Sequence, residues 1–214
     1  MREELRITEI FHSLQGETSR MGLPTVFVRL TGCPMRCGYC DSAYAFTGGK
    51  TQLIDDIMQQ IRAFSCNTIC VTGGEPLAQK AVHILFKRLC DEGFDVSVET
   101  GGGQPIETVD PRVSRILDIK TPGSGEMHNM HWPNVDAVNR RDEIKFVLVD
   151  RADYEWARDK VRQEKLNERA PVIFSPVWET LKPAELAEWV IADKLAVRVQ
   201  VQLHKILWGE KPGV

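Results

Sequence analysis

Short apolar runs that are rich in β-branched residues alternate along this chain with amphipathic stretches of helical spacing. The runs cover Arg6–Phe11, Thr25–Leu30, Thr68–Val71, Asp95–Glu99, Arg115–Ile119, Glu143–Val149, Pro171–Phe174 and Val197–Leu203. The amphipathic stretches cover Thr51–Ala63, Gln79–Asp91, Asp153–Leu166 and Pro183–Lys194. Strands that alternate with helices in this way predict βαβ units and a mostly parallel sheet.

The length of the chain limits how many such units it can contain. A complete barrel of eight βα units usually takes about 250 residues, and this chain has 214. We therefore predict a single α/β domain over residues 1–214, built as a partial, incomplete TIM-like (βα) barrel. The segment 123–139 is rich in Gly, Met, His, Asn and Pro, which predicts a loop or a short lid.

Polar and glycine-rich residues follow the predicted strands at the points where those strands end. Thr25–Leu30 leads to a cysteine-containing loop, and Thr68–Val71 leads to a Gly-Gly-Glu-Pro turn. Asp95–Glu99 and Arg115–Ile119 are followed by further polar and glycine-rich residues. Because parallel α/β folds place their chemistry at the carboxyl ends of the strands, we expect these segments to form one site.

Three cysteines in the first of these loops form a Cys-x-x-x-Cys-x-x-Cys pattern, at Cys33, Cys37 and Cys40. No fourth cysteine or nearby histidine completes the set. Structural metal sites usually have four protein ligands, and a position left open binds water or substrate. Since thiolates are the usual anchors of iron–sulfur clusters, the pattern indicates a cluster with one iron open to an outside ligand.

The Gly73-Gly74-Glu75-Pro76 turn has two possible roles. Its glycines let a ligand approach the backbone closely, and the exposed N–H and C=O groups can bind the ammonium and carboxylate of an amino acid. Alternatively, it is an ordinary turn in which Pro76 opens the next helix.

Arg29 lies inside an apolar run, four residues before the first cysteine. Arginine is the preferred partner of a carboxylate because its donors form a two-pronged fork. The residue therefore indicates either an anion-binding position or a buried ion pair with Glu9 or Glu17.

Composition excludes several other classes of protein. The net charge of −3 lacks the basic excess of proteins that coat nucleic acids or membrane surfaces, so we expect neither as a direct partner. No run of 18 apolar residues occurs, and the first residues lack the apolar stretch of a signal peptide. Six cysteines in such a chain indicate reduced thiols and a cytoplasmic location.

Taken together, these motifs resemble the 7-carboxy-7-deazaguanine synthase family of the radical S-adenosylmethionine (SAM) superfamily. The resemblance extends from about residue 7 to about residue 208. It depends on Ser13–Glu17, Arg29–Cys33, Cys33–Ser42, Val71–Pro76, Val98–Gly101 and Gln202–Lys205. It implies a partial barrel of the radical SAM type that works as a homodimer with a [4Fe–4S] cluster, SAM and Mg²⁺.

The resemblance also implies a role for individual residues, and no catalytic side chain beyond the cofactors. Cys33, Cys37 and Cys40 would hold the cluster, and Ser42 would bind Mg²⁺. The expected SAM contacts are Tyr39, Gly74, Glu75, Thr100, Asp118, Ile119, Lys120, Ser175, Pro176, Val177 and Trp178. The expected substrate contacts are Leu14, Gln15, Gly16, Arg29, Thr72, Gln202 and His204. His204 has an alternative interpretation as a hydrogen-bonded histidine inside the last strand.

The implied reaction converts 6-carboxy-5,6,7,8-tetrahydropterin to 7-carboxy-7-deazaguanine with loss of ammonia, a lyase step towards queuosine. A flavodoxin-type reductant would donate one electron, and SAM would then give a 5′-deoxyadenosyl radical that takes a hydrogen atom from the substrate. In such enzymes the cofactor does the difficult chemistry, and the protein orients the reactants.

Two alternatives remain from the sequence. The first is another small radical SAM enzyme, such as an activase that generates a glycyl radical on a partner protein. The second is a non-enzymatic iron–sulfur or zinc protein that acts as a scaffold or electron carrier. It would require a fourth protein ligand and no SAM site.

Overall fold

The computed structural model describes residues 3–211 and 213, so residues 1–2, 212 and 214 of the predicted domain lie outside the described residues. The strands are β1 (Glu4–Leu14), β2 (Pro24–Leu30), β3 (Lys50–Leu53), β4 (Thr68–Gly73), β5 (Asp95–Thr100), β6 (Ser114–Ile119), β7 (Glu143–Leu148), β8 (Val172–Pro176) and β9 (Arg198–Val199). The helices are α1 (Ile54–Ala63), α2 (Val82–Asp91), α3 (Asn134–Ala137), α4 (Arg151–Gln163), α5 (Leu166–Arg169), α6 (Pro183–Ala192) and α7 (Leu203–Trp208).

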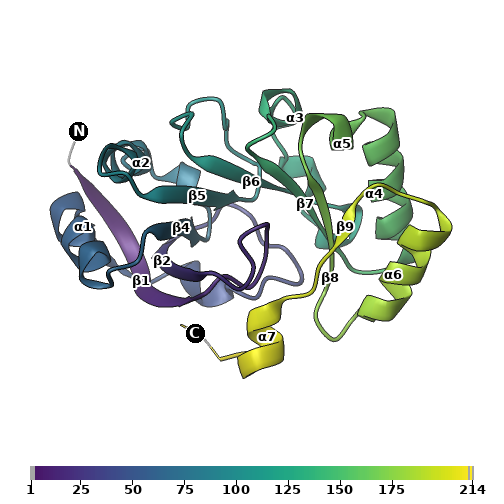
Figure 1. The fold of residues 1–214 in the computed structure, drawn as a ribbon, viewed down its shortest axis with the longest axis horizontal. Coiled ribbons are helices and arrows are strands. Elements are labelled where there is room, and N and C mark those ends of the chain that lie inside the picture. Colours follow the sequence, from purple (N-terminus) through teal and green to yellow (C-terminus); the bar gives the residue numbers. More distant parts are fainter. Residues whose placement is uncertain (1–2, 212, 214) are drawn as a thin grey trace.

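The described strands form one sheet in the order β3-β1-β2-β4-β5-β6-β7-β8-β9. β1 pairs antiparallel with β2 and β3, and every other neighbouring pair is parallel. The sheet is curved and does not close, and α1, α2, α4 and α6 lie along its outer side (Figure 1). The predicted α/β class and incomplete barrel are therefore confirmed.

Alternation along the strands gives the sheet two different faces. The outer face, which we call the helix face, carries apolar residues that pack with the helices in one core, for example Val28, Val71, Val98, Leu117 and Phe146. The inner face, which we call the cavity face, carries polar and charged residues that are sequence neighbours of these apolar residues. They are Arg29, Thr72, Glu99, Asp118 and Lys145.

The helices begin where local chemistry favours it. The Asp150 carboxylate caps α4 by accepting a hydrogen bond from the Asp153 N–H at 2.9 Å, and Lys160 and Arg162 lie in its last turn. Pro183 occupies the first turn of α6, where its fixed φ suits the start of a helix. Within residues 3–211 and 213, no helix has the length and apolar character that crossing a membrane requires.

Three sequence-based boundaries were wrong. Residues 51–53, assigned to a helix, form the edge strand β3 beside β1, and the following helix starts at Ile54. β1 continues to Leu14, because it pairs with β2 as far as Pro24. The last predicted strand contains only the two residues of β9, and Leu203 begins α7.

The segment 123–139, predicted as a loop or lid, is a support for the cysteine loop. It contains a 3₁₀ turn at Met127–Asn129 and the short helix α3. The Ser124 carbonyl accepts a hydrogen bond from the Gly38 N–H at 3.1 Å. Glu126 Oε1 accepts one from the Arg36 N–H at 2.8 Å.

Candidate active site

A cavity of about 550 Å³ lies against the cavity face, at the carboxyl ends of the parallel strands. It brings together most of the residues that the sequence assigned to a site. Those that line it are Leu14, Gln15, Gly16, Arg29, Cys33, Cys37, Tyr39, Cys40, Ser42, Thr72, Gly74, Thr100, Asp118, Lys120, Val177, Trp178, Gln202 and His204.

Four assigned residues do not line this cavity. Ile119 points to the helix face and is buried in the core, because the strand period of two places only Asp118 and Lys120 inward. Ser175 is buried in β8, and Pro176 borders a neighbouring apolar groove of about 340 Å³. Glu75 is buried behind the Gly-Gly-Glu-Pro turn.

The cysteine loop and the Gly-Gly-Glu-Pro turn are joined through their backbones. The Glu75 N–H donates to the Gly32 carbonyl at 2.8 Å, and the Gly74 N–H donates to the Leu30 carbonyl at 3.1 Å. A Cβ on Gly74 would lie 2.2 Å from the Gly32 oxygen. Only glycine therefore allows these two strand ends to approach so closely.

The three cysteines surround one part of the cavity, and each is partly buried. Burial raises the pKa of all three thiols, that of Cys37 to about 11, so metal binding must displace a proton from each. Among the described residues, no three His, Cys, Asp or Glu side chains gather around one point as a single ion would require. A [4Fe–4S] cluster is held by cysteine thiolates on separate irons. Its ligands therefore surround the whole cluster and do not meet at one point.

Glu75 fastens the end of β4 to the end of β5. Its carboxylate accepts hydrogen bonds from Thr100 Oγ1 at 2.9 Å, the Gly101 N–H at 2.8 Å and the Leu77 N–H at 3.0 Å. Burial raises the pKa of this carboxyl, and these hydrogen bonds oppose the rise. The carboxylate is thus occupied in holding the turn, and the backbone of Gly74 faces the cavity.

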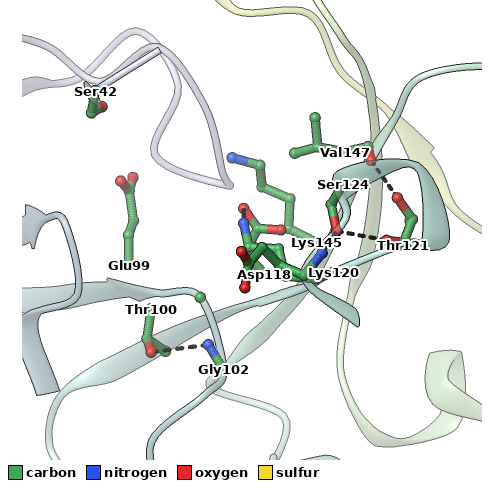
Figure 2. A network of polar contacts seen from close by, with 12 residues as sticks. Ser42, Glu99, Thr100, Gly102, Asp118, Lys120, Thr121, Ser124, Lys145 and Val147 are labelled. Carbon is green, nitrogen blue, oxygen red and sulfur yellow. Dashed lines mark hydrogen bonds and ion pairs between the residues drawn. The ribbon is translucent and has the colours of Figure 1, made fainter. Parts of the chain in front are cut away.

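Next to the cysteine loop, Lys120, Asp118 and Tyr39 form a buried polar group. Lys120 Nζ lies 3.1 Å from Asp118 Oδ2 and 6.0 Å from the centre of the Tyr39 ring. Burial lowers the pKa of Lys120, but Asp118, Tyr39 and Cys37 together outweigh it and raise the pKa overall, so the side chain is charged. Figure 2 shows Asp118, Lys120 and Lys145 grouped together, and Asp118 and Lys145 are register partners on β6 and β7.

Two polar atoms of this group, Tyr39 Oη and Asp118 Oδ1, are buried without a hydrogen-bond partner among the described residues, as is Ser175 Oγ in β8. Because buried polar groups are normally paired, the two atoms on residues that line the cavity indicate where polar groups of a ligand would bind. SAM, with its amino, carboxylate and ribose hydroxyl groups, fits such a set of donors and acceptors.

Arg29 forms one of the two ion pairs considered from the sequence, and it also lines the cavity. Its Nε donates to Glu9 Oε1 at 2.8 Å, which is one of the ion pairs considered. Its guanidinium also lines the cavity, and Nη1 lies 3.3 Å from Ser42 Oγ. Ser42 in turn donates to Asp41 Oδ1 at 2.9 Å. The guanidinium is therefore held in place by the Glu9 carboxylate while it borders the cavity.

Six charged residues of the cavity lining were not assigned to the site from the sequence: Glu17, Asp41, Glu99, Lys145, Lys205 and Glu210. Glu99 accepts hydrogen bonds from Thr72 Oγ1 at 2.9 Å and Gln15 Nε2 at 3.3 Å. Figure 2 shows Glu99 and Lys145 extending from their strands into the same space, below the loop that carries Ser42. A charged residue inside an apolar strand run was the signal that could have identified Glu99 and Lys145.

His204 lies on α7, so its interpretation as a residue of the last strand was wrong. The helix contacts the segment that follows β1, where the Leu203 N–H donates to the Gly16 carbonyl at 3.0 Å. The His204 ring packs on Gly16 so closely that a Cβ there would lie 1.9 Å from Nδ1. The structure thus brings Gln202 and His204 to the same side of the cavity as Gln15 and Gly16.

Comparisons with known proteins show which proteins the chain is similar to. The sequence profile of the radical SAM superfamily matches residues 27–114. The chain is 46% identical to a 7-carboxy-7-deazaguanine synthase of Chlorobaculum tepidum, over 96% of this chain and 94% of the relative. It is 42% identical to one of Koribacter versatilis, over 98% of this chain and 100% of the relative.

Among solved structures, the chain is similar to QueE from Escherichia coli, with a TM-score of 0.77 at 21% identity. The similarity covers 94% of this chain and 95% of that chain. It concerns the fold, which is an incomplete TIM-like barrel of the radical SAM type.

Proposed function

Because the chain belongs to the 7-carboxy-7-deazaguanine synthase family of radical SAM enzymes, we propose that it converts 6-carboxy-5,6,7,8-tetrahydropterin to 7-carboxy-7-deazaguanine with loss of ammonia. The observation that carries the proposal is a single cavity with two chemically distinct sides. The three thiols occupy one side, and a carboxylate-binding arginine with the amide and carboxylate groups of Gln15 and Glu99 occupies the other.

The cofactor side follows from membership of the superfamily, which implies a [4Fe–4S] cluster and SAM. Bound together, they supply one-electron chemistry that removes a hydrogen atom from the substrate. Cys33, Cys37 and Cys40 would hold the cluster. The residues proposed to line SAM are Tyr39, Gly74, Thr100, Asp118, Lys120, Val177 and Trp178, with Glu75, Ile119, Ser175 and Pro176 acting from behind the cavity lining.

The substrate side offers complementary groups for a carboxylated pterin. The Arg29 guanidinium would bind the carboxylate, because its fork matches two carboxylate oxygens. The Glu99 carboxylate would accept hydrogen bonds from N–H groups of the pterin ring, and Gln15 can both donate and accept. The remaining proposed contacts are Leu14, Gly16, Thr72, Gln202 and His204. These residues orient the substrate, and none of them is proposed to react.

Magnesium would bind between the two sides. The Ser42 hydroxyl and the adjacent Asp41 carboxylate are oxygen ligands of the kind Mg²⁺ prefers, and both border the cavity. A cation held there would add positive charge to that of the Arg29 guanidinium, whose Nη1 lies 3.3 Å from Ser42 Oγ, and so would favour a negatively charged substrate.

The wider context is part of the same proposal. The whole chain would act as one domain, function as a cytoplasmic homodimer and receive its electron from a flavodoxin-type protein. Its product would serve queuosine biosynthesis. The relatives favour this lyase over a glycyl-radical activase or a metal-binding scaffold, because their shared name specifies a small-molecule product.

The test is turnover by the anaerobically reconstituted chain with SAM, Mg²⁺, a reductant and the carboxylated tetrahydropterin. We expect 7-carboxy-7-deazaguanine, identified by its absorbance and mass, together with one equivalent of ammonia. Product without ammonia, or no consumption of the pterin by a cluster-loaded protein, would contradict the proposal.

A pair of cysteine variants provides the matched control. Cys37→Ala removes a proposed cluster ligand, so iron content and product should both be lost. Cys90→Ala changes a partly buried cysteine on α2 that packs against the core and should leave both intact. Equal iron content in the two variants would argue against the assigned ligands.

A further inference from the structure

Glu17 connects three parts of the chain that are distant in sequence. It lies in the turn between β1 and β2, and its carboxylate accepts hydrogen bonds from Lys145 Nζ on β7 and from Gln202 Nε2, at 2.8 Å, just before α7. The side chains of Glu17 and Lys145 are only 9% and 11% exposed. An ion pair so well shielded from water is costly to break from one side, because the remaining charge stays buried.

Hydrogen bonds between the Gln200 side chain and the Thr18 backbone accompany this ion pair. The Thr18 N–H donates to Gln200 Oε1 at 2.6 Å, and Gln200 Nε2 donates to the Thr18 carbonyl at 2.9 Å. The side-chain amide of Gln200 thus pairs with the backbone as a neighbouring strand would. Since β9 is two residues long and the sheet is open, these contacts fasten the end of the chain to its beginning.

The same turn presents the proposed substrate contacts. The Glu17 N–H donates to Gln15 Oε1 at 3.2 Å, and Gln15 Nε2 donates to Glu99 at 3.3 Å. Gln202, which donates to Glu17, also lies 3.1 Å from Asp41 Oδ2 in the cysteine loop. A displacement of Glu17 would therefore move groups on both sides of the cavity.

We propose that Glu17 and Lys145 form a latch, an ion pair that holds the turn 15–18 and the segment 200–204 together over the cavity and so sets its affinity for substrate. Both are positioning residues, which act through Gln15, Gly16 and Gln202. Burial lowers the pKa of Lys145, but Glu17, Asp118 and Glu99 outweigh it and raise the pKa, which keeps the latch charged. The effect on substrate affinity rests on the proposed function, whereas the contact between the turn 15–18 and the segment 200–204 does not.

Hydrogen exchange on the substrate-free full-length holoenzyme tests directly whether the latch holds the two segments together. Glu17→Gln should speed exchange of the Leu203 amide, which donates to Gly16, by about tenfold or more, because a buried charged partner is lost. Asp95→Asn is the matched control, since it breaks an exposed ion pair of Arg20, in the same β1–β2 turn, and should not change this amide. Unchanged exchange in Glu17→Gln, or an equal change in both variants, would overturn the latch.

Kinetics test the positioning role. Lys145→Met should raise the KM for the pterin about tenfold while kcat and iron content stay within about twofold, and Lys145→Arg should restore most of the affinity. Adding Glu17→Gln to Lys145→Met should raise KM no further, because the two residues act as a unit. A fall in kcat at unchanged KM would instead place Lys145 in the chemistry.

The two experiments fail in different ways. If the wild-type chain does not turn over the pterin, the proposed function fails, and hydrogen exchange still decides whether the latch exists. If Lys145→Met does not fold, Lys145→Arg and Glu17→Gln carry the same comparison of KM with kcat.

Discussion

The two faces of the sheet differ in what they contact, since one packs against helices and the other lines the cavity. On β7, Phe146 is fully buried on the helix face, while its neighbour Lys145 borders the cavity and pairs with a distant glutamate. The same alternation places Val98 outward beside Glu99, which faces inward. One set of strands therefore builds the core with one face and lines the cavity with the other, and each face can be altered separately.

The largest effect on stability should come from the helix face. The Phe146 ring lies 5.4 Å from that of Phe174 and 6.3 Å from that of Trp156, both at steep angles. Phe146→Ala should lower the free energy of unfolding by about 3–5 kcal/mol, because it leaves a void in a packed core. Urea denaturation measures this loss. Val147→Ala, on the cavity face of the same strand, should cost less, and equal losses would contradict the division between the faces.

A substitution on the cavity face should affect binding more than folding. Arg29→Met removes the proposed partner of the substrate carboxylate, which should weaken pterin binding by about 2 kcal/mol or more, or roughly 30-fold in KM. Arg29→Lys keeps the charge but loses the fork, so an intermediate KM is expected. The measurement is KM beside the denaturation midpoint of each variant. A large drop in stability at unchanged KM would show that the pair with Glu9 is purely structural.

The contact between Gly16 and His204 should have a smaller effect on stability when it is altered. Gly16→Ala places a methyl group against the His204 ring, an overlap that should cost about 1–3 kcal/mol in stability. The KM for the pterin should rise with it, because α7 must move. Adding His204→Ala creates room and should recover stability even though a polar group is lost. A double variant no more stable than Gly16→Ala would show that the overlap is not the cause.

The smallest effect lies outside both faces, in the loop before β6. The Arg112 guanidinium lowers the pKa of Asp110 from its usual 3.8 to about 2. Folding therefore favours the charged carboxylate, and its contribution is present above about pH 4 and lost as the pH falls towards 2. Asp110→Asn should reduce stability at pH 7 by about 1 kcal/mol or less, because Arg112 is exposed. Denaturation of the wild-type protein and the variant at pH 7 and at pH 2 should show the difference in stability only at pH 7.

The sequence predicted most of the sheet because alternation and strand length determine it. It missed β3, since residues 51–53 continue the apolar spacing of α1 without a break. It made the last strand too long, because the side chain of Gln200 bonds to the turn after β1 instead of extending a ladder. Six-residue α7 is too short to establish a helical period.

For the site, motif spacing was sufficient where function depends on one continuous segment. The cysteine loop and the Gly-Gly-Glu-Pro turn are such segments, and both border the cavity. The latch could not be predicted, because Glu17 and Lys145 are 128 positions apart and only the curvature of the sheet brings them together. A lysine within an apolar run indicates an inward charge without identifying its partner.

The contact between Gly74 and Gly32 has a practical consequence for protein engineering. A Cβ on Gly74 would overlap the Gly32 carbonyl, and Gly32 itself has a φ of 99° that other residues rarely adopt, so a library that varies either position would return mostly inactive clones. Diversity aimed at changing substrate scope is better placed at cavity-lining side chains that are not glycine, such as Phe11, Leu14 and Trp178.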